Sequence, residues 1–497
     1  MLKLLCIKNK GDSMENILRK CIDKFNNEDH EYYKQDIENE DAYNWMKENI
    51  PLIEIPDKTI EEIYYFRWWV FRKHIKNTPD GFVVTEFLPE VPWGGTYNTI
   101  IAAAGHHIAE AKWLKCRKRI VEDYLKLWLL EKSKTYLYSS WIIYALYEYC
   151  IQSDDFSFAI DNLELLVNYY KKTEEEHMTQ CGLMWSFDNN DAMEYSISGT
   201  TSDFEVKKGL RPTLNSYMAA NAYAISKIAE KSGDYKLSEE YYEKYLSLKE
   251  KITDILWDKD FYKAIHSDDF KNPSVDKIEK NQNVKELIGY IPWWFNLAPE
   301  GFENAFLELK SESGFLSDYG LTTAEKRHSR FLYKADHECL WNGYIWPFAT
   351  SQVLNSVISV INNYKQNVID KNDFYNILKS YAKMHYISND DGKKVCWIDE
   401  AKNPETNEWE CRKILENMGW VHEKGGFERG KDYNHSTFCD IVLKGLLGVN
   451  SGNGELLVSP LIPDEWDEFK IRNLWLNDKC YKIEYTKGIG IKITEIL

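Results

Sequence analysis

The sequence predicts a mostly helical fold that carries a small β-sheet at its C-terminal end. Apolar residues recur at steps of three and four over most of the 497 residues, which is the spacing of one face of an α-helix. No repeat of fixed period links these segments, so we expect a closed ring of helices rather than an open solenoid. The last segments alternate with a period of two, which is typical of strands.

The predicted helices follow one another as hairpins. One begins at Pro212, because proline suits the first turn of a helix, and it ends at Gly233, where glycine can adopt the left-handed conformation. The short Gly233-Asp234 turn folds the next helix, at 237–255, back on the first. Other helices are predicted at residues 60–75, 99–114, 117–130, 138–150, 156–170, 340–364, 374–385 and 436–447. Strands are predicted at residues 455–458, 469–476, 481–485 and 489–496.

Three regions are expected along the chain. They are a helical extension at residues 1–55, a helical domain at 56–450, and a small β region at 451–497. Long loops rich in aromatic residues, glycine and proline separate the helices. Loops of this length in a compact domain are usually functional, so the functional residues are expected there. These loops lie at residues 79–97, 181–211, 286–321 and 396–433.

The composition excludes several classes of partner. Lys and Arg total 62 and Asp and Glu total 79, so the net charge of −17 repels phosphate backbones and anionic membranes. No nucleic-acid or membrane partner is therefore expected. The apolar run at residues 1–7 is too short for the core of a signal peptide, which favours a cytoplasmic protein.

The aromatic and cysteine contents point to a sugar substrate and to no cofactor. Aromatic residues make up 14% of the chain, and their flat faces with polar tips suit sugar rings, so a small-molecule or oligosaccharide substrate is expected. The ten cysteines show no CxxC spacing and no neighbouring histidine cluster. We therefore expect reduced thiols and no zinc site, no other metal and no cofactor.

Hydrolysis of a glycosidic bond needs an acid for the leaving oxygen and a base or nucleophile on the opposite face of the ring. One candidate loop begins at Trp185 and contains Asp188, Asp191, Glu194 and Tyr195. Aromatic surroundings raise the pKa of a carboxyl group by desolvation, as a general acid requires. Asp188 and Asp191 could equally shape turns, which is a common use of aspartate.

A second carboxylate-rich loop begins at Cys396 and Trp397 and continues through Asp399 and Glu400 to Trp409. On its own, this pattern is also typical of a solvated acidic turn. The segment at residues 341–347 (Trp-Asn-Gly-Tyr-Ile-Trp-Pro) could likewise be a helix entry packed with core aromatic side chains. The residue types alone leave these alternatives open.

Three segments resemble glycoside hydrolase family sixty-three and its relatives, which include mannosylglycerate hydrolases and trehalases. Residues 341–347 resemble the family's Trp-Arg-Gly-Pro-x-Trp motif. Residues 191–196 resemble its acid segment, which implies Glu194, or alternatively Asp191, as the general acid. Residues 400–407 resemble its base segment, which implies Glu400 as the base. The resemblance implies an (α/α)6 toroid and inverting hydrolysis of an α-linked gluco- or manno-configured sugar.

The resemblance also implies which side chains contact the sugar. Arg211 is expected either to orient a carboxylate of the acid loop or to form a plain ion pair, and His106 and His107 are expected to pack within a helix. The implied substrate-binding residues are Arg67, Trp68, Trp93, Tyr97, Asn98, Trp185, Tyr195, Arg211, Trp341, Asn342, Gly343, Trp346, Trp397 and His435.

Other functions remain open from the sequence. A sugar epimerase or lyase on the same fold would rely on histidine, tyrosine or arginine. A thiolate glycosidase would use Cys396 or Cys411 together with a metal ion. A non-catalytic carbohydrate-binding or scaffold protein would need no acid and base at all.

Overall fold

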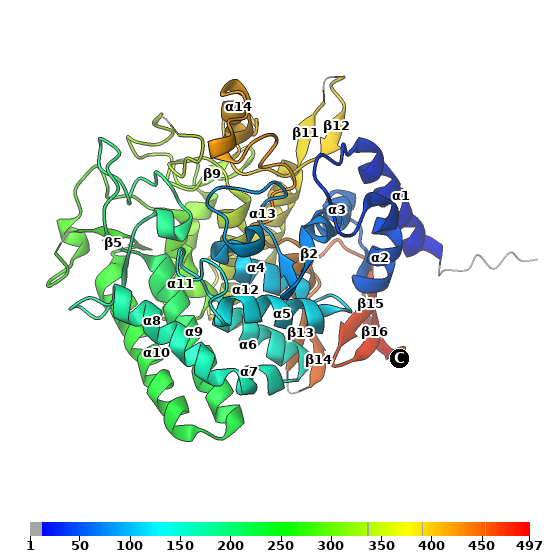
Figure 1. Cartoon of the computed structure of the whole chain (residues 1–497), viewed down its shortest axis with the longest axis horizontal. Coiled ribbons are helices and arrows are strands. Elements are labelled where there is room, and N and C mark those ends of the chain that lie inside the picture. Colours follow the sequence, from blue (N-terminus) through cyan, green and yellow to red (C-terminus); the bar gives the residue numbers. More distant parts are fainter. Residues whose placement is uncertain (1–11, 268, 335–336, 390, 453) are drawn as a thin grey trace, which may run out of the picture.

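The computed structural model describes residues 12–497 except 268, 335, 336, 390 and 453, and it is mostly helical with several small sheets (Figure 1). The apolar run at residues 1–7 lies outside the described residues. In the described part, none of the helices combines the length and the apolar character needed to cross a lipid bilayer.

Most of the helices lie where the apolar periodicity predicts them, but two short ones, Ile291–Trp294 and Glu410–Asn417, lie within segments predicted to be loops. The bounds of the helices are α1 (Asp12–Glu28), α2 (Ala42–Asn49), α3 (Lys58–His74), α4 (Ile101–Ala111), α5 (Arg117–Leu129), α6 (Ile142–Ser153), α7 (Ser157–Asp161), α8 (Leu163–His177), α9 (Pro212–Ser232), α10 (Tyr235–Leu256), α11 (Ile291–Trp294), α12 (Pro347–Asn363), α13 (Lys371–Met384) and α14 (Glu410–Asn417).

Three predicted helices differ from the structure. The helix expected at 156–170 is divided into α7 and α8, and the one expected at 436–447 contains a π-helix at Ile441–Leu446. The helix expected from residue 340 begins at Pro347, because proline fixes φ for a first turn and donates no backbone hydrogen bond. Residues 340–346 are consequently free to form part of a loop.

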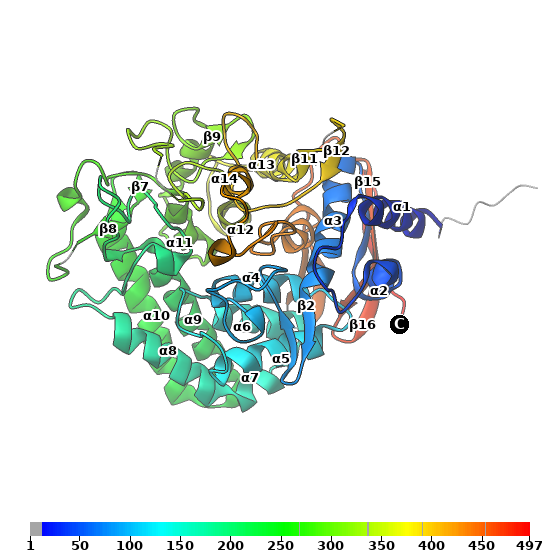
Figure 2. The ribbon, with the colours of Figure 1, turned by 45° about the horizontal axis from the view of Figure 1, so that its top comes forward.

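The hairpin of α9 and α10 forms as predicted. Gly233 closes α9 in the left-handed conformation with φ of +85°, and the Asp234 side chain accepts a hydrogen bond from the backbone N–H of Leu237 at the start of α10. Figures 1 and 2 both show these two helices side by side, next to α8. The turn chemistry therefore fixes this part of the fold locally.

The two ends of the described chain meet in one antiparallel sheet. Its strands are β1 (Leu52–Glu54), β15 (Glu468–Leu476), β16 (Lys479–Thr486) and β17 (Gly490–Glu495), in the order β1-β15-β16-β17. Ile53 of β1 pairs with Ile471 of β15, and both side chains are buried. The N-terminal region, predicted to be helical, thus also supplies a strand to the C-terminal sheet.

The remaining strands form short hairpins and one three-stranded sheet. Their bounds are β2 (Ile75–Thr78), β3 (Gly81–Val84), β4 (Trp185–Ser186), β5 (Gly209–Leu210), β6 (Trp257–Asp258), β7 (Phe261–Tyr262), β8 (Ile265–His266), β9 (Leu316–Ser317), β10 (Gly320–Leu321), β11 (Tyr386–Ser388), β12 (Lys394–Cys396), β13 (Val449–Gly452) and β14 (Glu455–Val458). β4 and β5 pair at the two ends of the predicted acid loop, so they hold that loop in place.

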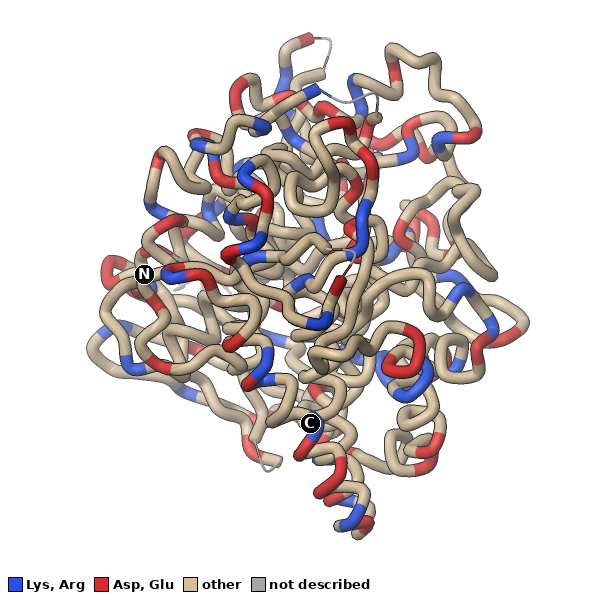
Figure 3. The backbone as a smooth tube through the Cα atoms, turned by 90° about the vertical axis from the view of Figure 1, so that its left-hand side faces the viewer, with Lys and Arg blue, Asp and Glu red and all other residues tan. Residues whose placement is uncertain are grey.

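The aromatic side chains fill the core, and the charges are spread over the chain. Trp68, Trp128, Trp141 and Trp293 are all fully buried in one large cluster. Figure 3 shows Lys and Arg interspersed with Asp and Glu along the backbone.

Candidate active site

The long loops converge on a cavity of about 280 Å³ that contains several carboxylates and two cationic side chains. Ten of the described residues that line it belong to three of the long loops singled out in the sequence: Glu86, Phe87, Trp93, Ala192, Glu194, Glu400, Glu423, Lys424, Arg429 and Tyr433. Among the residues that the structure describes, the lining consists of Glu86, Phe87, Trp93, Ile100, Ala102, Tyr138, Ala192, Glu194, His337, Glu338, Cys339, Trp346, Glu400, Glu423, Lys424, Arg429, Tyr433 and His435.

Another cavity, of about 400 Å³, lies at the C-terminal end of α6. It is lined by one carboxylate, Glu148, which is paired with Lys112 and Lys444. An acid and a base are both needed to cleave a glycosidic bond, so the smaller cavity is the candidate active site.

Glu194 has the properties of a general acid. Its side chain lines the cavity and is half-buried. Burial, together with the negative charges of Asp188 and Glu400, raises the pKa of Glu194 to about 8. The carboxyl group is therefore protonated at neutral pH, and it can give a proton to a leaving oxygen.

The other two carboxylates of the acid loop have structural partners. Asp191 accepts hydrogen bonds from Arg211 Nε over 2.6 Å and from the Ser139 hydroxyl over 2.7 Å. Asp188 accepts hydrogen bonds from the backbone N–H groups of Asn189 and Ser196. Neither side chain lines the cavity, so of the three only Glu194 is positioned to contact a substrate.

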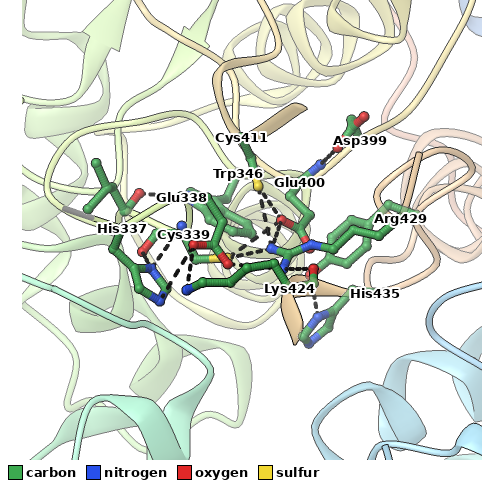
Figure 4. A network of polar contacts seen from close by, with 12 residues as sticks. His337, Glu338, Cys339, Trp346, Asp399, Glu400, Cys411, Lys424, Arg429 and His435 are labelled. Carbon is green, nitrogen blue, oxygen red and sulfur yellow. Dashed lines mark hydrogen bonds and ion pairs between the residues drawn. The ribbon is translucent and has the colours of Figure 1, made fainter. Parts of the chain in front are cut away.

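Glu400 follows β12 and is the best-connected carboxylate of the cavity. Its Oε2 atom accepts a hydrogen bond from Arg429 Nη2 over 2.7 Å and one from the Cys411 thiol, and the Cys339 thiol lies 3.5 Å away. Figure 4 shows these groups converging on the Glu400 carboxylate. Arg429 also donates to Glu338 over 3.0 Å, so one guanidinium group connects two carboxylates.

Two sets of side chains have donor atoms close enough to hold a metal ion. One is Cys339, Glu400 and Cys411, and the other is His337, Glu338 and Cys339; in each set the donor atoms lie within 4.8 Å of one another. The sequence predicted no metal site, and although His337, Glu338 and Cys339 are consecutive, Glu400 and Cys411 lie far from them along the chain. Folding brings together the loop before α12, the loop after β12 and the first turn of α14, and thiolate, imidazole and carboxylate groups suit a soft divalent cation such as zinc.

The thiols of this cluster are protonated when no cation is bound. A hydrogen bond with Cys411 lowers the pKa of Cys339, but burial and the charge of Glu400 outweigh it and raise the pKa to about 11. Burial raises the pKa of Cys411 well above its usual value. Arg429 lies 2.9 Å from the Cys339 sulfur, so a positive charge already faces the cluster.

Five of the predicted site residues line the cavity: Trp93, Glu194, Trp346, Glu400 and His435. The Trp93 ring lies 5.1 Å from the Arg429 guanidinium carbon, a cation–π arrangement. Several of the other predicted site residues lie behind the side chains that line the cavity.

The tryptophan motif mostly supports the wall from behind. Trp341 stacks on Trp346 with ring centroids 4.2 Å apart. Asn342 donates its amide to the backbone carbonyl of Tyr333, and Gly343 adopts a φ of +129° that side chains rarely tolerate. The predicted sugar contacts of Trp341, Asn342 and Gly343 therefore do not match their positions.

The first aromatic segment is also structural. Arg67 donates to the Tyr381 hydroxyl and to the Ser436 carbonyl, and Trp68 is fully buried in the core. Tyr97 donates to Asp80 at the surface, and the Asn98 side chain bonds the backbone of its own loop. These four side chains are not among those that line the cavity.

Four further predicted residues have other partners. Trp185 packs against His177, and Tyr195 packs against His337, which itself lines the cavity. Arg211 forms the ion pair with Asp191, and the Trp397 indole lies 3.4 Å from Asp399.

The two histidines of α4 pack within the helix bundle, as predicted. Both side chains are buried, and His107 lies 2.6 Å from the carbonyl oxygen of Asn434. Burial lowers the pKa of His107 to about 3, so its imidazole is neutral. Neither histidine lines the cavity, which leaves the epimerase and lyase alternatives with fewer candidate bases.

Sequence reasoning missed several residues of the cavity: Glu86, Tyr138, Glu338, Cys339, Lys424, Arg429 and Tyr433. Glu86 and Arg429 lie in two of the long loops singled out by their composition. No short motif contains either residue, so only the composition of these loops could have indicated them from the sequence.

Comparison with known proteins gives the family. Residues 96–436 match the family described as the mannosylglycerate hydrolase MGH1-like glycoside hydrolase domain. The chain belongs to this family. The matched region contains Glu194, Glu400 and Arg429, whereas Glu86 and Trp93 precede it. The glycoside hydrolase resemblance predicted from the sequence is thereby confirmed.

Solved structures share the fold. A structure named sialidase is 34% identical with a TM-score of 0.86, and the match covers 97% of this chain and 43% of that one. The present chain thus spans less than half of that protein. A GH78-family rhamnosidase of Bacillus sp. GL1 is 11% identical with a TM-score of 0.58, covering 90% of this chain and 42% of that one.

A relative is found among curated sequences as well. A Borreliella burgdorferi protein, described as uncharacterized, is 30% identical over 156 residues, which is 31% of this chain and 29% of that protein.

Proposed function

We propose that this protein hydrolyses a glycosidic bond and that Glu194 is the general acid. The observation that carries the proposal is that the half-buried Glu194 lines the same cavity as Glu400, with a pKa raised to about 8. A protonated carboxyl group beside a second carboxylate is the arrangement that glycosidic bond cleavage requires. Family membership supports the same reaction class.

Glu400 is the proposed general base of an inverting reaction. Glu194 would protonate the leaving oxygen while Glu400 takes a proton from a water molecule, and that water would attack the anomeric carbon from the opposite face. The ion pair with Arg429 fixes the Glu400 carboxylate in one orientation. In inverting enzymes the two carboxyl groups stand about 6.5–9.5 Å apart, which leaves room for the water.

The proposed substrate is an oligosaccharide or small glycoside with an α-linked gluco- or manno-configured sugar. The family description supports the manno configuration. The proposed arrangement of the helices is the six-hairpin toroid, which the hairpin of α9 and α10 and the structural likeness to the rhamnosidase support.

A thiolate glycosidase is the second candidate, because two thiols converge on Glu400. Cys339 lines the cavity, and its sulfur could attack the anomeric carbon while Glu194 protonates the leaving oxygen; water would then cleave the thioglycoside with retention. With a pKa of about 11, this thiol would need a bound divalent cation to ionise. Cys396 lies elsewhere, near Lys24, so it does not serve this mechanism.

One experiment tests both candidates. The purified protein is incubated with α- and β-linked aryl glycosides and disaccharides, and the anomer first released is identified by proton NMR. The inverted anomer, together with loss of turnover in Glu400→Gln and activity in Cys339→Ser, supports the proposal. The retained anomer, together with activity in Glu400→Gln and loss of turnover in Cys339→Ser, supports the thiolate mechanism. Release of no sugar would contradict both.

A further inference from the structure

We infer that the cavity accepts an uncharged sugar, disfavours sugars that carry a carboxylate, and uses Glu86 to bind sugar hydroxyl groups. The inference rests on the proposed function and adds the substrate class. It depends on three features of the cavity: its balance of charges, the pairing of its cations, and two unpartnered polar atoms.

The cavity contains more carboxylates than cations. Of the described residues that line it, Lys424 and Arg429 are basic, and the acidic ones are Glu86, Glu194, Glu338, Glu400 and Glu423. Glu194 is protonated at neutral pH because its pKa is raised to about 8, which leaves four other glutamates beside two basic side chains and the imidazoles of His337 and His435. A cavity with an excess of negative charge repels an anionic ligand, since charges interact strongly where water is excluded.

Both cations are already paired with carboxylates of the protein. Arg429 Nη1 bonds Glu338 over 3.0 Å and Nη2 bonds Glu400 over 2.7 Å. Lys424 Nζ lies 2.9 Å from the other oxygen of Glu338 (Figure 4). A sugar carboxylate is usually recognised by the two parallel N–H groups of an arginine. Here those groups are occupied, and freeing them would leave a glutamate buried without a partner.

Unlike the two paired cations, Glu86 and His435 each have a polar atom that is free to bind a ligand. His435 Nδ1 lies 2.7 Å from Glu86 Oε1, so one end of each side chain is fixed. Glu86 Oε2 and His435 Nε2 are buried and have no hydrogen-bond partner among the described residues. Both residues line the cavity. Because buried polar atoms are rarely left unpaired, these two call for a ligand with hydroxyl groups, and a carboxylate oxygen accepts well from a sugar hydroxyl.

The first test compares neutral sugars with their acids. Glucose, mannose and galactose are each paired with the corresponding uronate, which differs only by a carboxylate in place of the terminal CH2OH group. Binding to the intact protein is measured by calorimetry at neutral pH. At least one neutral sugar should bind, and its uronate should bind at least tenfold more weakly. Equal or tighter binding of a uronate, or binding by none of the neutral sugars, would overturn the inference.

The second test changes Glu86. Glu86→Gln keeps an oxygen for His435 but removes the charge that accepts from a sugar hydroxyl. It should weaken binding of the neutral sugar roughly 10- to 100-fold, the range of a charge-assisted hydrogen bond, while the melting temperature stays within about two degrees. Unchanged affinity would remove Glu86 from sugar recognition.

A charge reversal at the cavity mouth tests the electrostatic part separately. Glu423 lines the cavity and is exposed, so Glu423→Lys should fold normally. It should narrow the difference in affinity between the neutral sugar and its uronate at low salt, whereas Glu239→Lys, on the exposed face of α10, should not. No change in that difference would contradict the electrostatic argument. Because binding is measured without turnover, a failure here is distinct from failure of Glu194 as the acid.

Discussion

The guanidinium group of Arg429 lies 2.7 Å from the Glu400 carboxylate, and both side chains are almost fully buried. The two residues belong to one loop region that is interrupted by α14 and by a short 3-10 helix at His422–Lys424. The same guanidinium group reaches Glu338, from the loop before α12. One arginine thus ties together the two segments that carry the proposed base and the neighbouring thiols.

Removal of Arg429 should destabilise the fold more than removal of its partner. Arg429→Gln leaves Glu338 and Glu400 buried without their cation, which should lower the free energy of unfolding by about 3–5 kcal/mol. In Glu400→Gln/Arg429→Gln no unpaired charge remains at position 400, so part of that loss should be recovered. Denaturant unfolding of the two single variants and the double variant measures the coupling. If the loss of unfolding free energy in the double variant equalled the sum of the losses in the two single variants, the two residues would not be coupled.

Glu194→Gln should remove the alkaline limit of activity. In the unmodified protein the acid must be protonated, so kcat/KM should fall as the pH rises above about 8, the pKa of Glu194 in the ligand-free protein. The variant should lose about 100- to 10,000-fold in kcat on substrates with poor leaving groups. The loss should be much smaller with a dinitrophenyl glycoside, whose leaving group needs no proton. A pH–rate profile with both substrates provides the measurement.

Asp191→Asn is the matched control, because Asp191 is the alternative acid in the same loop. Its carboxylate pairs with Arg211, and both are buried away from the cavity. We expect a less stable protein whose folded fraction keeps the alkaline limit near pH 8. If the alkaline limit of activity disappeared in Asp191→Asn and persisted in Glu194→Gln, Asp191 and not Glu194 would be the general acid.

The thiol cluster should contribute to structure more than to chemistry if Glu400 is the base. Cys339→Ser and Cys411→Ser should then keep kcat within about tenfold of the unmodified protein. A chelator such as EDTA should leave the activity unchanged. Inactivation by the chelator with recovery on adding zinc, together with an inactive Cys339→Ser, would instead identify the thiolate mechanism. Metal analysis of the purified protein accompanies the kinetics.

Local chemistry made much of the fold predictable. The period of the apolar residues located α3, α5 and α9, and the Gly233-Asp234 turn predicted the hairpin to α10. The alternating C-terminal segments became β14 to β17. The pairing of β1 with β15 was not predictable, because it joins residues about 420 positions apart and depends on the tertiary fold.

The candidate site was predictable only in part, for the same reason. Glu194 and Glu400 were found because they lie in segments that resemble family motifs. Arg429 and Glu86 have no such segment, and their importance comes from distances across the fold, 2.7 Å to Glu400 and to His435 respectively. Of the two tryptophans in the motif, Trp346 lines the cavity and Trp341 stacks behind it, and one sequence cannot distinguish these two positions.

Asp399 should make stability depend on pH. Burial, and after it the charge of the adjacent Glu400, raise the pKa of Asp399 from 3.8 to about 7. The folded protein therefore keeps a proton that the unfolded chain releases between about pH 4 and 7, so the free energy of unfolding should fall across that range and then level off. Asp399→Asn removes this proton linkage and keeps an oxygen for the Glu400 N–H group. Relative to the unmodified protein, it should gain on the order of a few kcal/mol between pH 4 and pH 8. The free energy of unfolding of both proteins is measured at pH 4 and pH 8. If the difference between the variant and the unmodified protein were the same at the two pH values, Asp399 would be ionised in the folded protein.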